Sequence, residues 1–314
     1  MKIAFVYPGQ GSQVVGMAKD LYDNFLVAKE TLDTASEALK QDLKTIMFDG
    51  PVDLLTLTEN TQPALLTASL MAQKVLEKEL GKPISALAKS LAGHSLGEYS
   101  ALAAAGCFST EDAVMLVKLR GNAMQSSVPV GIGAMAAIIG LEMPKIEAML
   151  KDCPHTNEVI EIANDNSPGQ IVISGHANSI QWAIEKAKEM GAKRALPLPV
   201  SAPFHSSLMM PAANIMEQAL QSIEMKPMQV EVYANVTAAP YQQESVCNHL
   251  VQQITGRVRW VELISNMAKS GIDTFVEIGT GKVLSGLIKR IVPDANVYNF
   301  GKAEELDAIK SLWS

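Results

Sequence analysis

The sequence predicts an α/β protein with two parts: an α/β-hydrolase-like large domain with a mainly parallel sheet, and an inserted ferredoxin-like small domain. Short apolar runs alternate with amphipathic segments, as in a parallel sheet covered by helices. A Gly-x-Ser-x-Gly turn at residues 93–97 joins one such run to a helical segment. After residue 128 the pattern becomes β-α-β-β-α-β over about 65 residues, the ferredoxin-like order.

The first part of the chain predicts a buried strand followed by helices. Residues 2–7 (KIAFVY) are apolar enough for a buried strand, and a Gly-rich turn follows at 8–11. Residues 12–80 are mostly helical by pattern, most clearly over 63–80. The remaining elements expected before the insertion are a short buried strand over 87–93, a helix from Gly97 to Ala105, and a helix over 111–125 that Thr110 caps.

The small domain is expected over residues 128–198, and the large domain over 1–127 and 199–314. Glycine and proline cluster at the first boundary, and a Pro-rich stretch at 197–203 leads back to the large domain. The small domain should contain strands at 134–139, 159–163, 170–174 and 193–197 and helices at 144–151 and 178–190. Beyond it we expect helices at 210–223, 244–254, 261–270 and 282–291 and strands at 229–234, 274–278 and 296–300.

Composition excludes several classes of protein. The 314 residues are 48% hydrophobic and 19% charged, which is enough apolar material for a sizeable core. A net charge of −7 opposes nucleic acid and anionic membranes, so we expect neither as a partner. The cysteines Cys107, Cys153 and Cys247 form no Cys-x-x-Cys pair, which is typical of a reducing compartment. With no signal-peptide or membrane-span pattern, we expect a cytoplasmic protein.

Ser95, in Gly93-His94-Ser95-Leu96-Gly97, has the pattern of a nucleophile elbow. A sharp turn between strand and helix would project its hydroxyl into a cleft, and flanking glycines would avoid clashes. The N–H of Leu96 would then lie at a helix N-terminus, where it can stabilise an oxyanion. The alternative is an ordinary turn in which Ser95 caps the helix.

An activated serine needs a general base, and five histidines are available. His205 is the best candidate because it lies in an apolar, Pro-stiffened loop where the small domain rejoins the large one. A packed or capping histidine is the alternative. Acidic residues that could complete a hydrolase triad, between serine and histidine in chain order, all fall inside the inserted domain. This absence of a triad acid in the large domain argues against a plain esterase. No histidine pair has metal-ligand spacing, and we expect no metal and no bound cofactor.

Seven segments together resemble the malonyl-CoA:acyl-carrier-protein transacylases and the related acyltransferase domains of fatty-acid and polyketide synthases. They span almost the whole chain in the family's order: PGQGSQ at 8–13, TQPAL at 61–65, GHSLGEYSAL at 93–102, LRGNAMQ at 119–125, NDNSPGQIVISG at 164–175, SAPFHS at 201–206 and EIGTGKVLSGL at 277–287. The resemblance implies transfer of malonyl from coenzyme A, as a thioester substrate, to acyl carrier protein, its partner.

The resemblance also implies a role for each matching residue. Ser95 is expected to be the acyl-accepting nucleophile and His205 its base. Arg120 is expected to bind the malonyl carboxylate, a role that suits the planar fork of a guanidinium. Gln253, with Gln252 as the neighbouring alternative, is expected to orient the histidine in place of an acid.

Four further residues are expected at the substrate. Gln10 and the amide of Leu96 would form the oxyanion hole, and His94 and Gln62 would line the cleft. Two other functions stay open from the sequence: a serine esterase or thioesterase built on the same elbow, and a non-catalytic module that binds carrier protein. Whether the product serves fatty-acid or polyketide synthesis also stays open.

Overall fold

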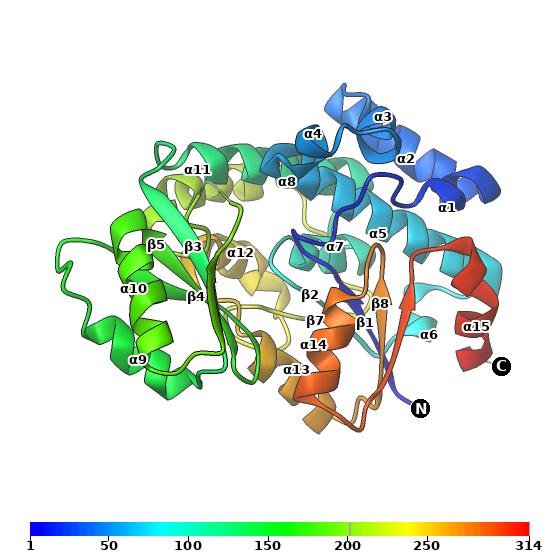
Figure 1. The fold of residues 1–314 in the computed structure, drawn as a ribbon. Coiled ribbons are helices and arrows are strands. Elements are labelled where there is room, and N and C mark those ends of the chain that lie inside the picture. Colours follow the sequence, from blue (N-terminus) through cyan, green and yellow to red (C-terminus); the bar gives the residue numbers. More distant parts are fainter. Residues whose placement is uncertain (201, 314) are drawn as a thin grey trace.

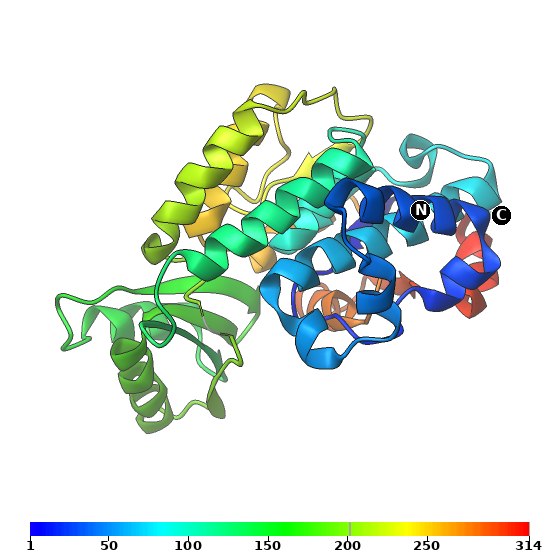
Figure 2. The same ribbon diagram turned by 90° about the horizontal axis from the view of Figure 1, so that it is seen from above.

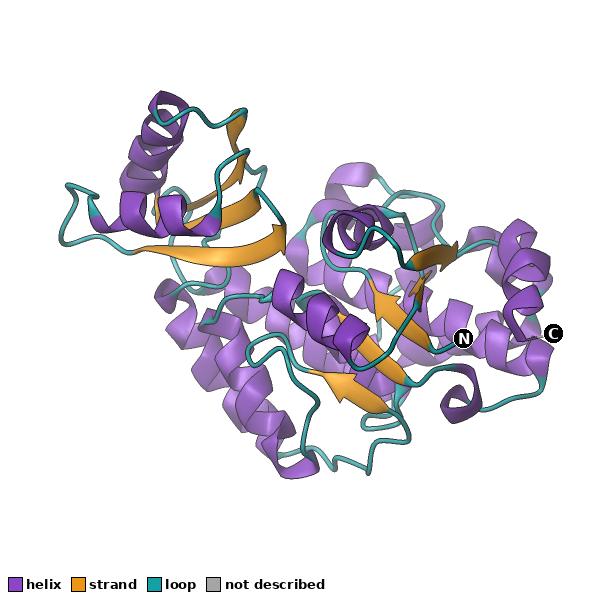
Figure 3. Cartoon of the chain, turned by 90° about the horizontal axis from the view of Figure 1, so that it is seen from below, coloured by secondary structure: helices purple, strands orange, loops and turns teal. Residues whose placement is uncertain are grey.

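The computed structural model describes residues 1–200 and 202–313, and these contain two separate β-sheets (Figures 1 and 3). The larger, sheet A, has the strand order β7-β2-β1-β8-β9, and every neighbouring pair is parallel. The parallel sheet that the sequence predicts is therefore confirmed. Its strands are β1 (Ile3–Tyr7), β2 (Ser90–Gly93), β7 (Glu231–Tyr233), β8 (Thr274–Ile278) and β9 (Asn296–Phe300).

Helices cover both faces of sheet A. Alternate residues of β1 enter two different cores: Phe5 and Tyr7 pack in the larger one, whereas Ala4 and Val6 pack with Trp260 on the opposite face. The helices of this part are α1 (Lys19–Asn24), α2 (Leu26–Leu39), α3 (Leu43–Phe48), α4 (Val52–Thr56), α5 (Thr58–Leu80), α6 (Ile84–Leu87), α7 (Leu96–Ala104), α8 (Thr110–Ser126), α11 (Met210–Gln221), α12 (Val246–Thr255), α13 (Trp260–Lys269), α14 (Val283–Ile291) and α15 (Leu306–Lys310).

Sheet B is antiparallel, with the order β4-β5-β3-β6. Helix α8 runs toward it, and residues 127–132 make the connection (Figure 2). Its elements are β3 (Gly133–Ile139), α9 (Met143–Lys151), β4 (Ile160–Ser167), β5 (Gln170–His176), α10 (Ala177–Glu189) and β6 (Arg194–Pro197). The predicted order β-α-β-β-α-β is confirmed.

Sheet B has its own core on one face and joins the large core with the other. Ile138, Ile173 and Ile184 belong to the core under α9 and α10. Met135 and Val172 point the other way and pack with the large core. A backbone bridge between Asn164 of β4 and Val258 also ties the two parts together. Sheet B therefore forms one side of any cleft between the parts.

The carboxyl ends of β1 and β2 lie together, because Tyr7 pairs with Gly93 in the sheet register. The turn that carries Gln10 and the turn that carries Ser95 therefore leave the sheet at the same edge. Ligands of open parallel sheets bind at this edge. Among the described helices, none combines the length and the apolar character needed to cross a membrane.

Some element boundaries differ from the predicted ones. The strand predicted over 87–93 begins only at Ser90, because Pro83 starts a helical turn over Ile84–Leu87. Helix α8 already includes Thr110, and its cap is Ser109, whose side chain accepts a hydrogen bond from the Asp112 amide. The prediction that Thr110 is the cap was therefore wrong by one position.

Candidate active site

Ser95 lies at a strained turn between β2 and α7, with φ 53° and ψ −107°. A non-glycine residue with positive φ is uncommon and costs about 1–3 kcal/mol, so surrounding structure must hold it there. The amide of Ser95 donates to Asn235 Oδ1 at 2.8 Å. This backbone conformation projects the hydroxyl away from the helix and into the cavity, as the pattern Gly-x-Ser-x-Gly predicts.

The two glycines of the turn are required by space. A Cβ on Gly93 would lie 1.8 Å from the carbonyl oxygen of Gly97, and a Cβ on Gly97 would lie 2.1 Å from that of Tyr7. Both obstacles are backbone atoms, which cannot rotate away. The glycines let α7 start directly against the ends of β1 and β2, and this close approach fixes the position of Ser95.

His205 faces the serine. Its Nε2 lies 2.7 Å from Ser95 Oγ, and its Nδ1 lies 2.9 Å from the carbonyl oxygen of Gln253 and 3.1 Å from that of Gly256. Carbonyl oxygens only accept, so Nδ1 carries the proton and Nε2 is left free to accept from the serine hydroxyl. This is the tautomer that a general base requires.

Burial, followed by the charge of Arg120, lowers the pKa of His205 to about 3. The imidazole is therefore neutral over the physiological range. We expect ¹⁵N NMR to show the Nδ1–H tautomer of His205 unchanged from pH 8 to pH 5. In Arg120→Ala the midpoint should move upward, because a neighbouring cation is removed. A wild-type midpoint near the usual histidine value of about 6.5 would contradict this electrostatic picture.

Arg120 is a buried cation beside the serine, with only 1% of its surface exposed. Its Nη1 donates to Gln62 Oε1 at 2.8 Å, and its Nη2 donates to Ser95 Oγ at 3.0 Å and to Gln253 Oε1 at 2.8 Å. All of these acceptors are neutral, and no carboxylate of a described residue forms an ion pair with it. The buried carboxylate of Glu98 attracts this cation electrostatically, but Gln253 lies between them. Because the guanidinium forms no direct ion pair with a described carboxylate, it can still receive the carboxylate of an anionic group.

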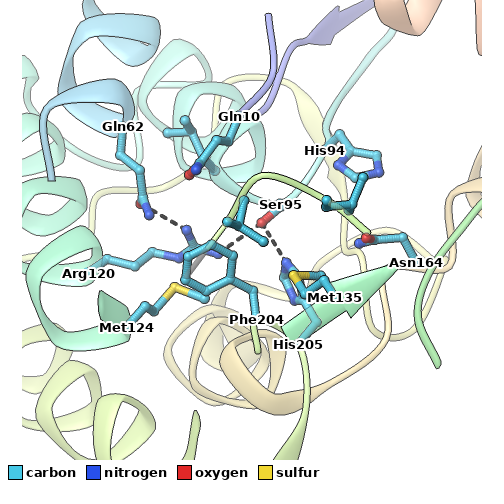
Figure 4. Close-up of a pocket in the computed structure, with 13 residues that line it drawn as sticks. Gln10, Gln62, His94, Ser95, Arg120, Met124, Met135, Asn164, Phe204 and His205 are labelled. Carbon is cyan, nitrogen blue, oxygen red and sulfur yellow. Dashed lines mark hydrogen bonds between the residues drawn. The ribbon is translucent and has the colours of Figure 1, made fainter. Parts of the chain in front are cut away.

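A small cavity of about 120 Å³ opens over these groups (Figure 4). Sheet B contributes Met135 and Asn164 to its wall, and Phe204 and Met124 line it as well. Its complete lining is Gln10, Gln62, His94, Ser95, Leu96, Arg120, Met124, Met135, Asn164, Leu198, Val200, Phe204 and His205. The structure therefore brings together seven of the eight residues that the sequence singles out. The eighth, Gln253, lies directly behind them.

The side chain of Gln253 does not touch the histidine. Its backbone carbonyl does, while its side-chain amide binds Arg120, the carbonyl of Ser95 and Glu98. The neighbouring Gln252 is exposed, so position 253 is the one that faces the site. The backbone carbonyl of Gln253 therefore orients His205. Its side chain instead links Arg120 to Glu98 and to the Ser95 carbonyl.

The other predicted residues surround the serine. Leu96 is the first residue of α7, so its N–H is among those that a helix leaves without an internal acceptor. Gln10 lies in the turn after β1, and its Nε2 donates to Thr58 Oγ1 at 3.3 Å. His94 is half-buried, and its Nε2 lies 2.7 Å from Asn166 Oδ1 in β4. A contact between the elbow and sheet B is thereby formed.

Sequence reasoning missed the residues behind the serine, above all Glu98 and Asn235. Asn235 follows β7 and holds the Ser95 amide, and Glu98 is a fully buried carboxylate in the first turn of α7. The available signal was a glutamate among apolar residues of a helix, since a buried charge must find partners. Those partners come from segments more than 130 residues away.

Comparisons with known proteins give one consistent result. The family model described as acyl transferase domain matches residues 4–299. Malonyl CoA-acyl carrier protein transacylase of Bacillus subtilis (strain 168) is 46% identical over 92% of this chain and 90% of its own length. The protein of the same name from Escherichia coli (strain K12) is 44% identical, with 93% of each chain covered.

Solved structures agree. The acyl-carrier-protein-S-malonyltransferase from Bartonella henselae has a TM-score of 0.97 and 47% identity, with 99% of each chain covered. A malonyl-transacylase solved in complex with its type II PKS acyl-carrier protein has a TM-score of 0.95 and 40% identity, with 99% of this chain and 100% of that chain covered. A match of this extent, with Ser95, His205 and Arg120 gathered at one cavity, means that the chain belongs to the acyl transferase domain family and is an acyltransferase.

Proposed function

We propose that this protein moves a malonyl group from coenzyme A to the phosphopantetheine thiol of acyl carrier protein, and so supplies fatty-acid or polyketide synthesis. The observation that carries the choice of acyl group is the buried guanidinium of Arg120, 3.0 Å from the serine hydroxyl and bonded only to neutral acceptors. A guanidinium fork binds a carboxylate through two parallel hydrogen bonds. Malonyl has such a carboxylate, and acetyl does not. The names of the relatives support the same acyl group.

The first half-reaction forms a malonyl-serine ester. The malonyl carboxylate binds Arg120, in place of part of its present contacts with Gln62 and Gln253. Ser95 Oγ attacks the thioester carbon while His205 Nε2 accepts the hydroxyl proton. The developing oxyanion is bound by the Leu96 N–H and by Gln10. When the C–S bond breaks, the proton on His205 passes to the sulfur, and coenzyme A leaves as a thiol.

The second half-reaction reverses these roles. The pantetheine thiol of the carrier protein gives its proton to His205 Nε2 and attacks the ester carbon. The C–O bond to Ser95 breaks, and the same proton returns to Oγ. The enzyme alternates between a free and a malonylated form, so it follows ping-pong kinetics. The imidazole that does this is oriented by two backbone carbonyls rather than by a carboxylate.

Intact-protein mass spectrometry tests the proposal. The protein is mixed separately with malonyl-CoA, methylmalonyl-CoA and acetyl-CoA, and holo acyl carrier protein is then added. We expect one malonyl adduct per chain, little or no adduct with acetyl-CoA, and transfer of the malonyl mass to the carrier protein. Adduct release to water instead of to the carrier protein would identify a thioesterase. No adduct with any thioester would leave only a binding module.

The division of the chain and its location are also proposals. We infer that residues 1–127 and 199–314 form one domain of α/β-hydrolase-like character and that 128–198 form the other. The core that sheet B forms with α9 and α10 supports the division, and the strained nucleophile turn supports the hydrolase-like character. We also infer a cytoplasmic location, supported by the free thiols of Cys107, Cys153 and Cys247.

A further inference from the structure

Glu98 is a fully buried carboxylate whose partners come from three segments of the chain. Its Oε1 accepts from Tyr241 Oη at 2.6 Å and from the Asn235 amide at 2.9 Å, and its Oε2 accepts from Gln253 Nε2 at 2.7 Å. It does not line the cavity and touches neither Ser95 Oγ nor His205. Its effect on the reaction therefore passes through these neighbours or through the electrostatic attraction between its carboxylate and the charge of Arg120.

The first route leads through Gln253 to Arg120. Arg120 Nη2 donates to Gln253 Oε1, and Gln253 Nε2 donates both to Glu98 Oε2 and to the carbonyl of Ser95. The amide is thereby fully used, and its oxygen must face the arginine. A carboxylate at position 98 fixes this direction, because it can only accept.

The second route leads through Asn235 to the nucleophile turn. Glu98 holds the Asn235 backbone, while the Asn235 side chain accepts from the Ser95 amide at 2.8 Å and donates to the Gly93 carbonyl at 2.7 Å. The Asn235 side chain therefore forms hydrogen bonds on both sides of the strained turn. Both routes begin at the same carboxylate.

We propose that Glu98 is a positioning residue. Its carboxylate directs the oxygen of the Gln253 amide toward Arg120 and holds Asn235 against the nucleophile turn, so that the side chains of Ser95, His205 and Arg120 keep their relative positions. The inference rests on the proposed function, because it is read out through malonyl transfer. It assigns a task to a residue that lies outside the cavity.

Replacing the carboxylate with an amide, as in Glu98→Gln, should break this arrangement without changing its shape. If the introduced amide kept its oxygen toward Tyr241 and Asn235, its NH₂ would face the NH₂ of Gln253. Turning the introduced amide over would bring its NH₂ against the Asn235 N–H. Turning Gln253 instead would set its oxygen against the Ser95 carbonyl and its NH₂ against Arg120. Every orientation leaves a buried mismatch, and such mismatches are costly.

Protonation of Glu98 should weaken the same contacts, because hydrogen bonds to a charged acceptor are the stronger ones. Burial raises the pKa of Glu98 to about 7, against the hydrogen bonds from Tyr241, Asn235 and Gln253 and the charge of Arg120. The other titratable groups nearby are Tyr99 and Tyr241, whose pKa values burial raises, so both stay neutral. Glu98 is thus the group that changes charge near neutrality.

The test is Glu98→Gln in the full-length protein, with kcat/KM for malonyl-CoA measured from pH 5.5 to 8.5. We expect a fall of about 10- to 100-fold at pH 8, with a smaller fall for acetyl-CoA, which makes no carboxylate contact with Arg120. We also expect the wild type to lose activity severalfold as the pH falls through about 7, and Glu98→Gln to lack this limb. Both proteins share the substrate's own ionisations, so the comparison isolates Glu98.

Glu277→Gln is the matched control. Glu277 is another fully buried glutamate, and it binds the Leu284 and Ser285 amides at the start of α14, away from the cavity. It should lower the melting temperature and leave the pH profile and the preference for malonyl-CoA unchanged. If Glu98→Gln behaves in the same way, Glu98 is only structural and the proposal is wrong.

Tyr241→Phe keeps the proposal testable if Glu98→Gln fails to fold. Loss of the tyrosine hydrogen bond raises the pKa of Glu98 further, so the acid limb should move to higher pH. An unmoved limb would overturn the assignment. Failure of the proposed function can be told apart from failure of the Glu98 proposal. If the proposed function is wrong, the wild-type protein itself forms no malonyl adduct.

Discussion

Ser95→Ala should abolish the malonyl adduct and lower transfer to acyl carrier protein by at least about 10⁴-fold. In the proposed mechanism the Ser95 hydroxyl oxygen is acylated, and it lies 2.7 Å from the imidazole of His205 and 3.0 Å from the guanidinium of Arg120. The measurement is intact-protein mass spectrometry after mixing with malonyl-CoA, followed by a transfer assay. Because alanine fits the same backbone, circular dichroism should show an unchanged fold.

Ser100→Ala is the matched control for this loss. Ser100 is a fully buried serine on the same helix, and its hydroxyl has no hydrogen-bond partner within the described part of the chain. Its removal should leave labelling intact. Adduct formation by Ser95→Ala at the wild-type rate would show that another residue is the nucleophile, and the mechanism would have to be abandoned.

Arg120→Ala should reverse the choice of acyl group. Without the guanidinium, a bound malonyl carboxylate would be an unpaired buried charge, so kcat/KM for malonyl-CoA should fall by about 10²–10³-fold. The kcat/KM for acetyl-CoA should stay the same or rise. Acetyl has no carboxylate to pair with the buried guanidinium, so removing that cation does not weaken its binding. The measurement is the ratio of the two kcat/KM values in the variant and in the wild type.

Arg120→Lys supplies the intermediate case. A lysine keeps the charge but lacks the planar fork that binds both carboxylate oxygens, so we expect only part of the malonyl preference to remain. Equal losses for malonyl-CoA and acetyl-CoA in Arg120→Ala would mean that the arginine only supports Ser95. The cationic site would then have no part in substrate choice.

Local pattern was sufficient to predict most of the fold. Strands 274–278 and 296–300 lie where the alternation of strand and helix patterns predicted them, and both belong to the parallel sheet. Helix ends were less accurate. Their position depends on single hydrogen bonds, such as the one from the Asp112 amide to Ser109, which no hydrophobic pattern records.

The active site likewise has a part that local sequence predicted and a part that it did not. The elbow was visible in sequence because its glycines are needed locally, where backbone atoms leave no room for a Cβ. The network behind it was not, because Glu98, Asn235 and Gln253 are brought together only by the packing of β7, α7 and α12. The role of the Gln253 carbonyl could not be read from the residue type at all, since every residue has a carbonyl.

Sheet B and the residue that follows it supply Met135, Asn164 and Leu198 to the cavity, whereas the proposed nucleophile, the proposed base and Arg120 all belong to the rest of the chain. Part of the cavity wall is therefore encoded in a different stretch of the gene from the groups proposed to carry out the reaction. Substitutions at Met135, Asn164 or Leu198 can therefore change the shape of the cavity while the sequence that carries Ser95, His205 and Arg120 stays the same.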